Sequence, residues 1–365
     1  MRARFLLLFL LAFPLFAQTE AELNKQGYEL LAQKKTQEAI AIFKRNVDEH
    51  PHSANAYDSL GEAYMIAGMR WTAIDMYRRA LALQPNSENA FNMLRKLGSS
   101  ITTEEWAHMF RPIIPNDVEY IANVTYRVID ERPLRLHVLR PKQSRRPLPA
   151  LVFVHGGGWS EGTKERGLVP LLHFVKRGFI GVTIDYRLTD AAKFPAQIDD
   201  VRAAIAFVRS NAKAYGIDPK RIAIWGQSAG GHLAALAGTM GGVDAVIDWN
   251  GPTDFTHDTA TNLEESAIFR LFNGQPSAEL AAKADPVTYV SADDPPFLIL
   301  HGTADKTVPM ADSERLYAAL QRAGVFVELK KIEGAMHFGP GNVTDSKAHE
   351  GAIVGAMEKF LDERL

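Results

Sequence analysis

Ser228, Asp305 and His337 have the types, and the order along the chain, that acyl transfer requires. The serine lies in Gly226–Gly230, a G-x-S-x-G sequence between an apolar run and a helical stretch. Such a nucleophile elbow turns sharply and exposes the serine Oγ, and glycine is needed there because a side chain would collide with the neighbouring strand. The aspartate and the histidine each follow a later expected strand. We therefore expect a nucleophile, an orienting acid and a general base.

A glycine-rich loop, His155–Trp159, follows the apolar run Ala150–Val154. Successive glycines leave backbone N–H groups unobstructed, as an oxyanion hole requires. A phosphate-binding loop is the alternative, but it would need a helix to begin here, and it usually carries Lys-Ser/Thr, whereas Ser160-Glu-Gly-Thr-Lys-Glu follows. His155 itself is expected to shape the loop. The predicted oxyanion donors are the backbone N–H groups of Gly157, Gly158 and Ala229.

The substrate pocket is less well defined by the sequence. The segment 251–290 is a long excursion between two strands, and such insertions often cover a pocket. Ordinary helix packing is the alternative for its aromatic side chains, and it is slightly favoured. The residues predicted to line the pocket are Trp159, Gln227 and Phe255. Rivals to the proposed acid and base are Asp293 and Asp294, which precede their strand, and His349, which opens a helical run.

Apolar, β-rich runs alternate with helical stretches from residue 118 onward, after an antiparallel pair at Val118–Val128 and Leu134–Leu139. Continuous apolar strands alternating with helices predict a mostly parallel sheet that is covered on both faces. In such sheets ligands lie beyond the carboxyl ends of the strands. The further expected strands are Ala150–Val154, Phe179–Ile184, Arg221–Trp225, Ala245–Trp249, Pro296–Leu300 and Val325–Lys330.

Residues 118–365 resemble the α/β-hydrolase superfamily. The branch they resemble is the acetyl esterase/lipase one related to hormone-sensitive lipase, with a BD-FAE-like pattern. The resemblance implies an eight-stranded, mostly parallel sheet with helices on both faces and a Ser-His-Asp triad. The segment after Leu188 departs from the Ala-Pro-Glu that this branch often carries, which favours its relatives among small secreted esterases. The motifs are His155–Trp159, Asp185–Leu188, Phe194-Pro195, Gly226–Gly231 and His301–Asp305.

Residues 20–98 repeat with a period of 34 residues, as the pairs Gly27 and Gly61 or Pro51 and Pro85 show. The spacing resembles the tetratricopeptide repeat, in which each unit is a pair of antiparallel helices. A protein- or peptide-binding groove and a spacer or oligomerisation module are equally compatible with this pattern. Residues 99–117 have the composition of a linker.

The first 17 residues predict a signal peptide. Arg2 and Arg4 precede a short apolar run that ends near Ala17, a plausible cleavage site. The run is about 12 residues long, below the ~20 needed to span a bilayer. An uncleaved anchor is the alternative reading. The predicted location is therefore periplasmic or secreted, with no transmembrane segment beyond the signal peptide.

The composition of the chain excludes several kinds of partner and of catalytic chemistry. A net charge of −2 gives no reason to expect a nucleic acid partner, and the absence of cysteine excludes disulfides, thiolate metal sites and cysteine nucleophiles. No metal or cofactor is expected. The sequence thus predicts a secreted serine carboxylesterase for short-chain acyl esters, with acetyl and feruloyl esters of carbohydrates as candidate substrates. A serine peptidase or other acyl hydrolase of the same fold, and a binding scaffold built on the repeats, are the alternatives.

Overall fold

The computed structural model describes residues 18–84, 87–97, 114–144, 146–255, 266–337 and 347–365. The chain forms two compact units, residues 1–84 with 96–99 and residues 85–95 with 100–365. The predicted signal peptide and most of the predicted linker lie outside the described residues. The predicted domain limits therefore stay predictions. Among the described residues, no helix has the length and apolar character needed to cross a membrane.

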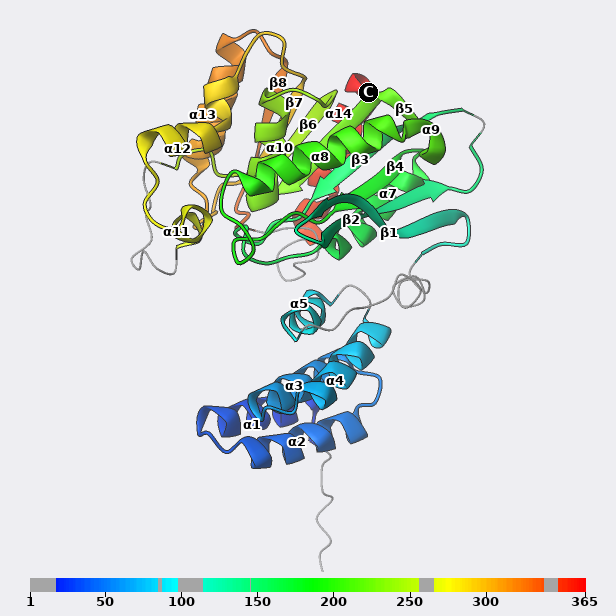
Figure 1. Cartoon of the computed structure of the whole chain (residues 1–365), viewed down its shortest axis with the longest axis vertical. Helices are drawn as coiled ribbons and strands as arrows, with labels where there is room; N and C mark the ends of the chain where they lie inside the picture. Colours follow the sequence, from blue (N-terminus) through cyan, green and yellow to red (C-terminus); the bar gives the residue numbers. More distant parts are fainter. Residues whose placement is uncertain (1–17, 85–86, 98–113, 145, 256–265, 338–346) are drawn as a thin grey trace, which may run out of the picture. The chain divides into compact units, whose positions relative to one another are not determined.

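The first unit is helical and is called the helical repeat below (Figure 1). Consecutive helices of the repeat pack against each other in hairpins. The next helix in the chain, α5 (Glu88–Lys96), falls in the second unit except for its last residue. The helices of the repeat are α1 (Glu20–Ala32), α2 (Thr36–Glu49), α3 (Ala54–Ile66) and α4 (Arg70–Leu83).

Each hairpin of the repeat is built around a glycine that faces an aromatic ring. A Cβ on Gly27 would lie 2.4 Å from the buried ring of Phe43, and a Cβ on Gly61 would lie 3.1 Å from the ring of Tyr77. The missing side chain lets the two helices of each hairpin approach closely. The same pairing recurs after 34 residues, which is the period of the sequence, while the tetratricopeptide assignment stays a prediction.

The second unit contains one eight-stranded sheet and is called the sheet domain below. The strand order is β1-β2-β4-β3-β5-β6-β7-β8, in which only the β1–β2 and β2–β4 pairs are antiparallel. This confirms the predicted fold class and the antiparallel pair at its start. The strands are β1 (Val118–Ile129), β2 (Arg132–Pro141), β3 (Leu148–Val154), β4 (Ile180–Ile184), β5 (Ile217–Gln227), β6 (Ala245–Trp249), β7 (Phe297–Gly302) and β8 (Val327–Ile332).

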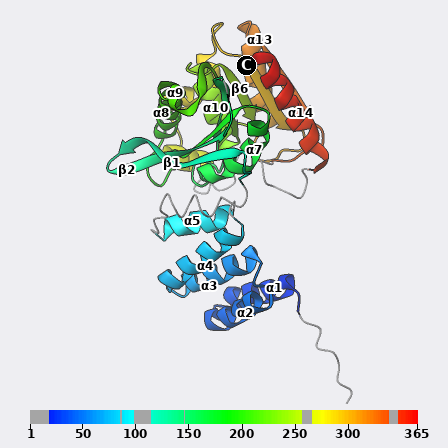
Figure 2. The same ribbon diagram turned by 90° about the vertical axis from the view of Figure 1, so that its right-hand side faces the viewer.

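Helices cover both faces of the sheet, as the edge-on view in Figure 2 shows. On one face α8 (Ala196–Ser210) packs against α10 (Ala229–Thr239). On the other face α7 (Leu168–Lys176) is joined to α14 (Lys347–Arg364) by ion pairs such as that between Arg177 and Asp362. Strands β3, β4, β6 and β7 are almost wholly buried, which explains their continuous apolar sequences.

The remaining elements lie in the connections between the strands. They are η1 (Lys164–Gly167), α9 (Ala212–Tyr215), α11 (Ala267–Phe272), α12 (Ala278–Ala284), η3 (Pro286–Tyr289) and α13 (Met310–Arg322). The expected helices at Ile198–Val208 and Ser313–Leu320 correspond to α8 and α13. The predicted excursion after β6 contains α11, α12 and η3, and its residues 256–265 lie outside the described ones.

Candidate active site

Ser228 occupies a strained turn between β5 and α10. Its backbone has φ 55° and ψ −124°, a conformation that a non-glycine residue rarely adopts. Two glycines make this turn possible. A Cβ on Gly226 would lie 2.0 Å from the carbonyl oxygen of Gly230, and a Cβ on Gly230 would lie 2.1 Å from the carbonyl oxygen of Val154. At both glycines the backbone packs directly against other backbone atoms, which leaves no room for a side chain at either position.

The glycine-rich loop lies against this elbow. A Cβ on Gly156 would fall 3.2 Å from the Cβ of Ser228. Gly157 and Gly158 both have positive φ, 114° and 54°, and the next residue, Trp159, has φ 55°. The three consecutive left-handed residues explain the need for glycine at the first two positions. The predicted oxyanion donors Gly157, Gly158 and Ala229 thus belong to two segments that meet beside Ser228.

His337 lies between the other two predicted residues of the triad. Its Nε2 is 3.0 Å from Ser228 Oγ, and its Nδ1 is 2.7 Å from Asp305 Oδ2. The serine follows β5, the aspartate follows β7 and the histidine follows β8, so three strand ends bring them together. This arrangement lets a neutral His337 accept the serine proton at Nε2 while the aspartate fixes the tautomer with hydrogen on Nδ1.

Asp305 is held in its ionised form. Burial alone would raise the pKa of this carboxyl, but hydrogen bonds from His301, His337 and the Val308 amide outweigh burial and hold the pKa well below its usual range. Its Oδ1 also accepts a hydrogen bond from the Thr307 amide at 2.8 Å. The carboxylate is therefore available to orient His337 throughout the neutral pH range.

His301, in the motif that ends at Asp305, is a buried histidine beside this carboxylate. Its Nε2 lies 3.0 Å from the Val308 carbonyl oxygen and 3.4 Å from Asp305 Oδ2, while its Nδ1 lies 2.7 Å from Ser313 Oγ. It thereby fixes the turn that carries Asp305. The sequence signal was its position at the end of a buried strand.

The loops that carry the acid and the base are joined to each other. The amides of Thr303 and Ala304 donate to the carbonyl oxygens of Ile332 and Ala335, at 3.0 and 2.9 Å. The Gly334 amide donates to Thr303 Oγ1 at 2.8 Å. These bonds set the spacing of Asp305 and His337 before any substrate arrives.

The rival acid and base lie elsewhere. Asp294 accepts hydrogen bonds from the amide and hydroxyl of Ser291 in the turn before β7, at 3.1 and 3.0 Å. His349 belongs to α14, which packs against the sheet. The histidine within hydrogen-bond distance of both Ser228 Oγ and Asp305 Oδ2 is His337.

The residues predicted to line the pocket differ in exposure. Trp159 and Phe255 are 2% and 1% exposed, so neither offers an open surface to a substrate in this structure. Their rings pack beside His232 in the interior. Gln227, at the end of β5, is only partly buried. This burial favours the packing role that the sequence left open for the aromatic side chains.

Two buried polar groups near the elbow were missed by sequence reasoning. His232, in the first turns of α10, contacts Trp159 and the Ala284 carbonyl. Asp248, in β6, accepts a hydrogen bond from the Gly251 amide at 2.9 Å, and burial raises its pKa to about 6. In the sequence both residues stand inside apolar runs and have no spacing that would reveal their partners.

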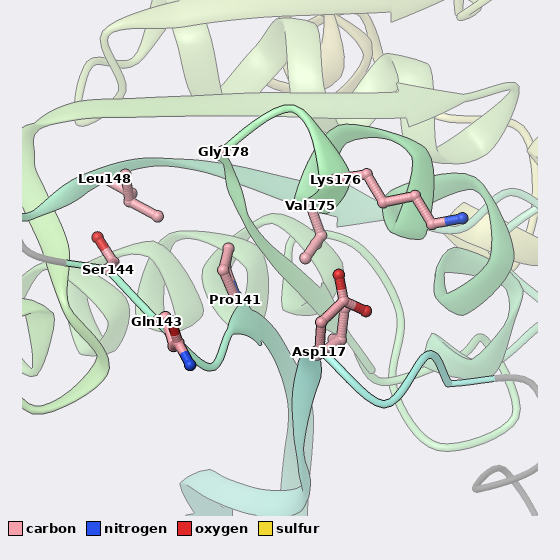
Figure 3. A pocket seen from close by; sticks show the side chains of 9 residues that line it. Asp117, Pro141, Gln143, Ser144, Leu148, Val175, Lys176 and Gly178 are labelled. Atoms are coloured by element: carbon pink, nitrogen blue, oxygen red, sulfur yellow. The ribbon is translucent and has the colours of Figure 1, made fainter.

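A cavity of about 220 Å³ opens at the amino ends of the parallel strands β3 and β4, opposite the strand ends that carry the triad (Figure 3). It is lined by residues at the start of β1 and β3, including Val118 and Leu148, and by Gly178 before β4. Because Ser228 follows the carboxyl end of β5, this cavity does not belong to the triad.

Similar curated proteins include esterases. Esterase LipC of Mycobacterium tuberculosis is 31% identical over 241 residues, which cover 59% of each chain. Carboxylesterase NlhH of the same species is 32% identical over 59% of this chain and 73% of its own. The chain spans 50–59% of the length of the first three curated relatives that it matches.

Solved structures of esterases have the same fold. A truncated carbohydrate esterase from gut microbiota superposes with a TM-score of 0.59 and 31% identity, over 67% of this chain and 96% of its own. Esterase Est2 of Thermogutta terrifontis gives a TM-score of 0.56 and 28% identity, over 68% of this chain and 92% of its own. The BD-FAE family model matches residues 136–320, just over half of the sequence. The chain therefore belongs to the BD-FAE family of α/β-hydrolases.

Proposed function

We propose that this protein is a serine carboxylic ester hydrolase. The observation that carries the proposal is the series of contacts from Ser228 Oγ to His337 and on to Asp305, at 3.0 and 2.7 Å. The esterase names of its relatives support the same activity.

In the proposed mechanism, Ser228 Oγ attacks the ester carbonyl while His337 Nε2 takes its proton. The tetrahedral oxyanion is stabilised by the backbone N–H groups of Gly157, Gly158 and Ala229, each worth ~10²–10³ in turnover. His337 then protonates the leaving alcohol, and an acyl-enzyme forms on Ser228. Water repeats the cycle on the acyl-enzyme and releases the acid.

We infer that the substrates are short-chain acyl esters, with acetyl or feruloyl esters of carbohydrates as the favoured class. The support is the structural similarity to a carbohydrate esterase from gut microbiota and to a bifunctional GH43-CE protein of Bacteroides eggerthii. A panel of p-nitrophenyl esters from acetate to long chains, with acetylated xylan and feruloyl esters, would rank the acyl groups. Peptide amides in the same panel test the peptidase alternative.

Ser228→Ala tests the activity itself. We expect this variant to lose ~10⁴-fold or more in kcat on p-nitrophenyl acetate, with unchanged thermal unfolding. A fluorophosphonate probe should label the wild-type protein and not the variant. Wild-type rates in the variant would overturn the proposal, and an unlabelled wild type would favour a binding scaffold.

Export and a binding role for the helical repeat are further parts of the proposal. Residues 1–17 and the 34-residue period support them. Mass spectrometry of the mature N-terminus from the periplasm or the medium tests export. A pull-down with the full chain, compared with a Tyr28→Ala variant of the exposed repeat surface, tests the binding role.

A further inference from the structure

Trp159 holds an unfavourable backbone conformation beside the predicted oxyanion donors. It follows Gly157 and Gly158 with φ 55°, and left-handed backbone costs a residue with a Cβ on the order of 1–2 kcal/mol. Its carbonyl oxygen accepts a hydrogen bond from the Thr189 amide at 2.9 Å. The surroundings must hold this residue in place, because a shift of Trp159 would turn the two preceding amides.

The indole of Trp159 is held by one hydrogen bond inside the protein. Its Nε1 donates to His232 Nδ1 at 3.2 Å, and both side chains are nearly or fully buried. The two rings meet edge to face, with centroids 5.4 Å apart. The ring of Phe255 packs on both, at 6.0 Å from Trp159 and 4.8 Å from His232. Water is therefore excluded from this hydrogen bond, which strengthens it.

The two ring nitrogens of His232 have different roles. Nε2 lies 2.7 Å from the carbonyl oxygen of Ala284, which can only accept, so Nε2 carries the hydrogen. Nδ1 is then an acceptor, as the indole N–H requires. Burial lowers the pKa of His232 to about 4, which keeps the imidazole neutral at neutral pH and preserves this tautomer.

His232 also belongs to the nucleophile elbow. Its backbone amide donates to the carbonyl oxygen of Ser228 at 3.0 Å, in the first turn of α10. One residue thus contacts the serine through its backbone and the glycine-rich loop through its side chain. These two segments carry the attacking oxygen and the oxyanion donors, whose relative position decides how well a transition state is bound.

We propose that His232 is a positioning residue that, through the indole of Trp159, holds the Gly157 and Gly158 amides in register with Ser228. The proposal rests on the proposed esterase function. It assigns Trp159 to the support of the oxyanion loop and not to the wall of the substrate pocket.

The first test is kinetic and uses a matched tryptophan. Trp159→Phe keeps an aromatic ring and removes the indole N–H. Trp225→Phe makes the same change at a buried tryptophan whose indole nitrogen has no hydrogen-bond partner among the described residues. We expect Trp159→Phe to lower kcat on p-nitrophenyl acetate by ~10- to 100-fold with little change in KM, and Trp225→Phe to change neither by more than about threefold. Equal losses in the two variants would overturn the proposal.

A double-mutant cycle adds a second criterion. His232→Leu removes both side-chain hydrogen bonds, and we expect a kcat loss like that of Trp159→Phe. In the double variant the losses should not multiply, because both substitutions break the same contact. Fully multiplicative losses would contradict the proposal.

Hydrogen exchange of the indole N–H tests the contact without any substrate. In ¹H–¹⁵N spectra, His232→Leu should accelerate exchange at Trp159 and leave Trp225 unchanged. Unaltered exchange at Trp159 would overturn the positioning role. A wild-type protein that hydrolyses no ester would instead refute the proposed function, while the exchange result still decides whether His232 holds Trp159.

Discussion

The helical repeat and the sheet domain use glycine for close packing in two different ways. In the repeat, Gly27 and Gly61 face the rings of Phe43 and Tyr77, which are side chains that can move. In the sheet domain, Gly226 and Gly230 face carbonyl oxygens of the backbone, which cannot move without displacing a strand or a helix. The contrast indicates that tolerance to substitution depends on what lies opposite the glycine.

The two regions also differ in what they bury. Within the described residues of the repeat, Asn46 and Ser59 are the buried polar side chains. The sheet domain buries several histidines and ionisable groups, among them His232, Asp248 and His301. Buried polar groups need specific partners, so the sheet domain is the more demanding of the two.

The largest expected effect is on the chemistry assigned to the sheet domain. Asp305→Asn should lower kcat by ~10⁴-fold, because the amide no longer fixes the reactive tautomer of His337. Ester hydrolysis at pH 7 measures the loss. The matched control is Asp294→Asn, in the turn before β7, which should keep wild-type rates. Comparable activity of the two variants would remove Asp305 from the mechanism.

Gly226→Ala should have the next largest effect, on both folding and activity. The new Cβ would lie 2.0 Å from a backbone carbonyl, so β5 or α10 must shift. We expect a loss of about 3 kcal/mol or more in the free energy of unfolding and a kcat reduction of ~10²-fold. Urea unfolding and ester hydrolysis measure the two effects. A stable, fully active variant would show that the elbow tolerates a side chain.

Asp248 should make the stability of the sheet domain depend on pH. Burial raises its pKa to about 6 from 3.8, so the folded state holds this proton more tightly than the unfolded state. The contribution of Asp248 to stability is therefore greatest at low pH, falls by about 3 kcal/mol as the pH rises from about 4 to 6, and then levels off. Relative to Asp248→Asn, the wild type should lose stability over that window in urea unfolding. A pH-independent difference would contradict the shifted pKa.

The smallest effects are expected in the helical repeat. Gly27→Ala places a Cβ 2.4 Å from a ring, which must shift, and we expect a net loss of about 1 kcal/mol. In Gly61→Ala the new Cβ would lie 3.1 Å from the ring of Tyr77, a milder contact. The gain of about 1 kcal/mol in helix propensity should offset it, so we expect almost no change in the free energy of unfolding. Amide hydrogen exchange, measured on peptides from residues 20–83, compares the stability of the two variants with that of the wild type. Ester hydrolysis should be unchanged in both variants.

Much of this organisation could be predicted from the sequence. Buried parallel strands are continuous apolar runs, so β3 to β8 were found within a few residues, and the motifs after β3, β5, β7 and β8 indicated the site. His232 could not be assigned a role, because its partners are Trp159 and Ala284, which are distant in the chain and have no spacing that links them to His232. Asp248 was hidden for the same reason. Exposure of Trp159 and Phe255 depends on tertiary packing, which periodicity does not reveal.

The hydrogen bonds between the Asp305 and His337 loops have a consequence for protein engineering. The amides of Thr303, Ala304 and Gly334, together with the Thr303 hydroxyl, join the two loops, so the loops form one structural unit although they are distant in sequence. If one of the two loops is replaced by the corresponding loop of a related protein, hydrogen-bond donors and acceptors of the remaining loop would lose their partners. Transplanting the two together should preserve the acid–base geometry and leave the oxyanion loop free to be redesigned separately.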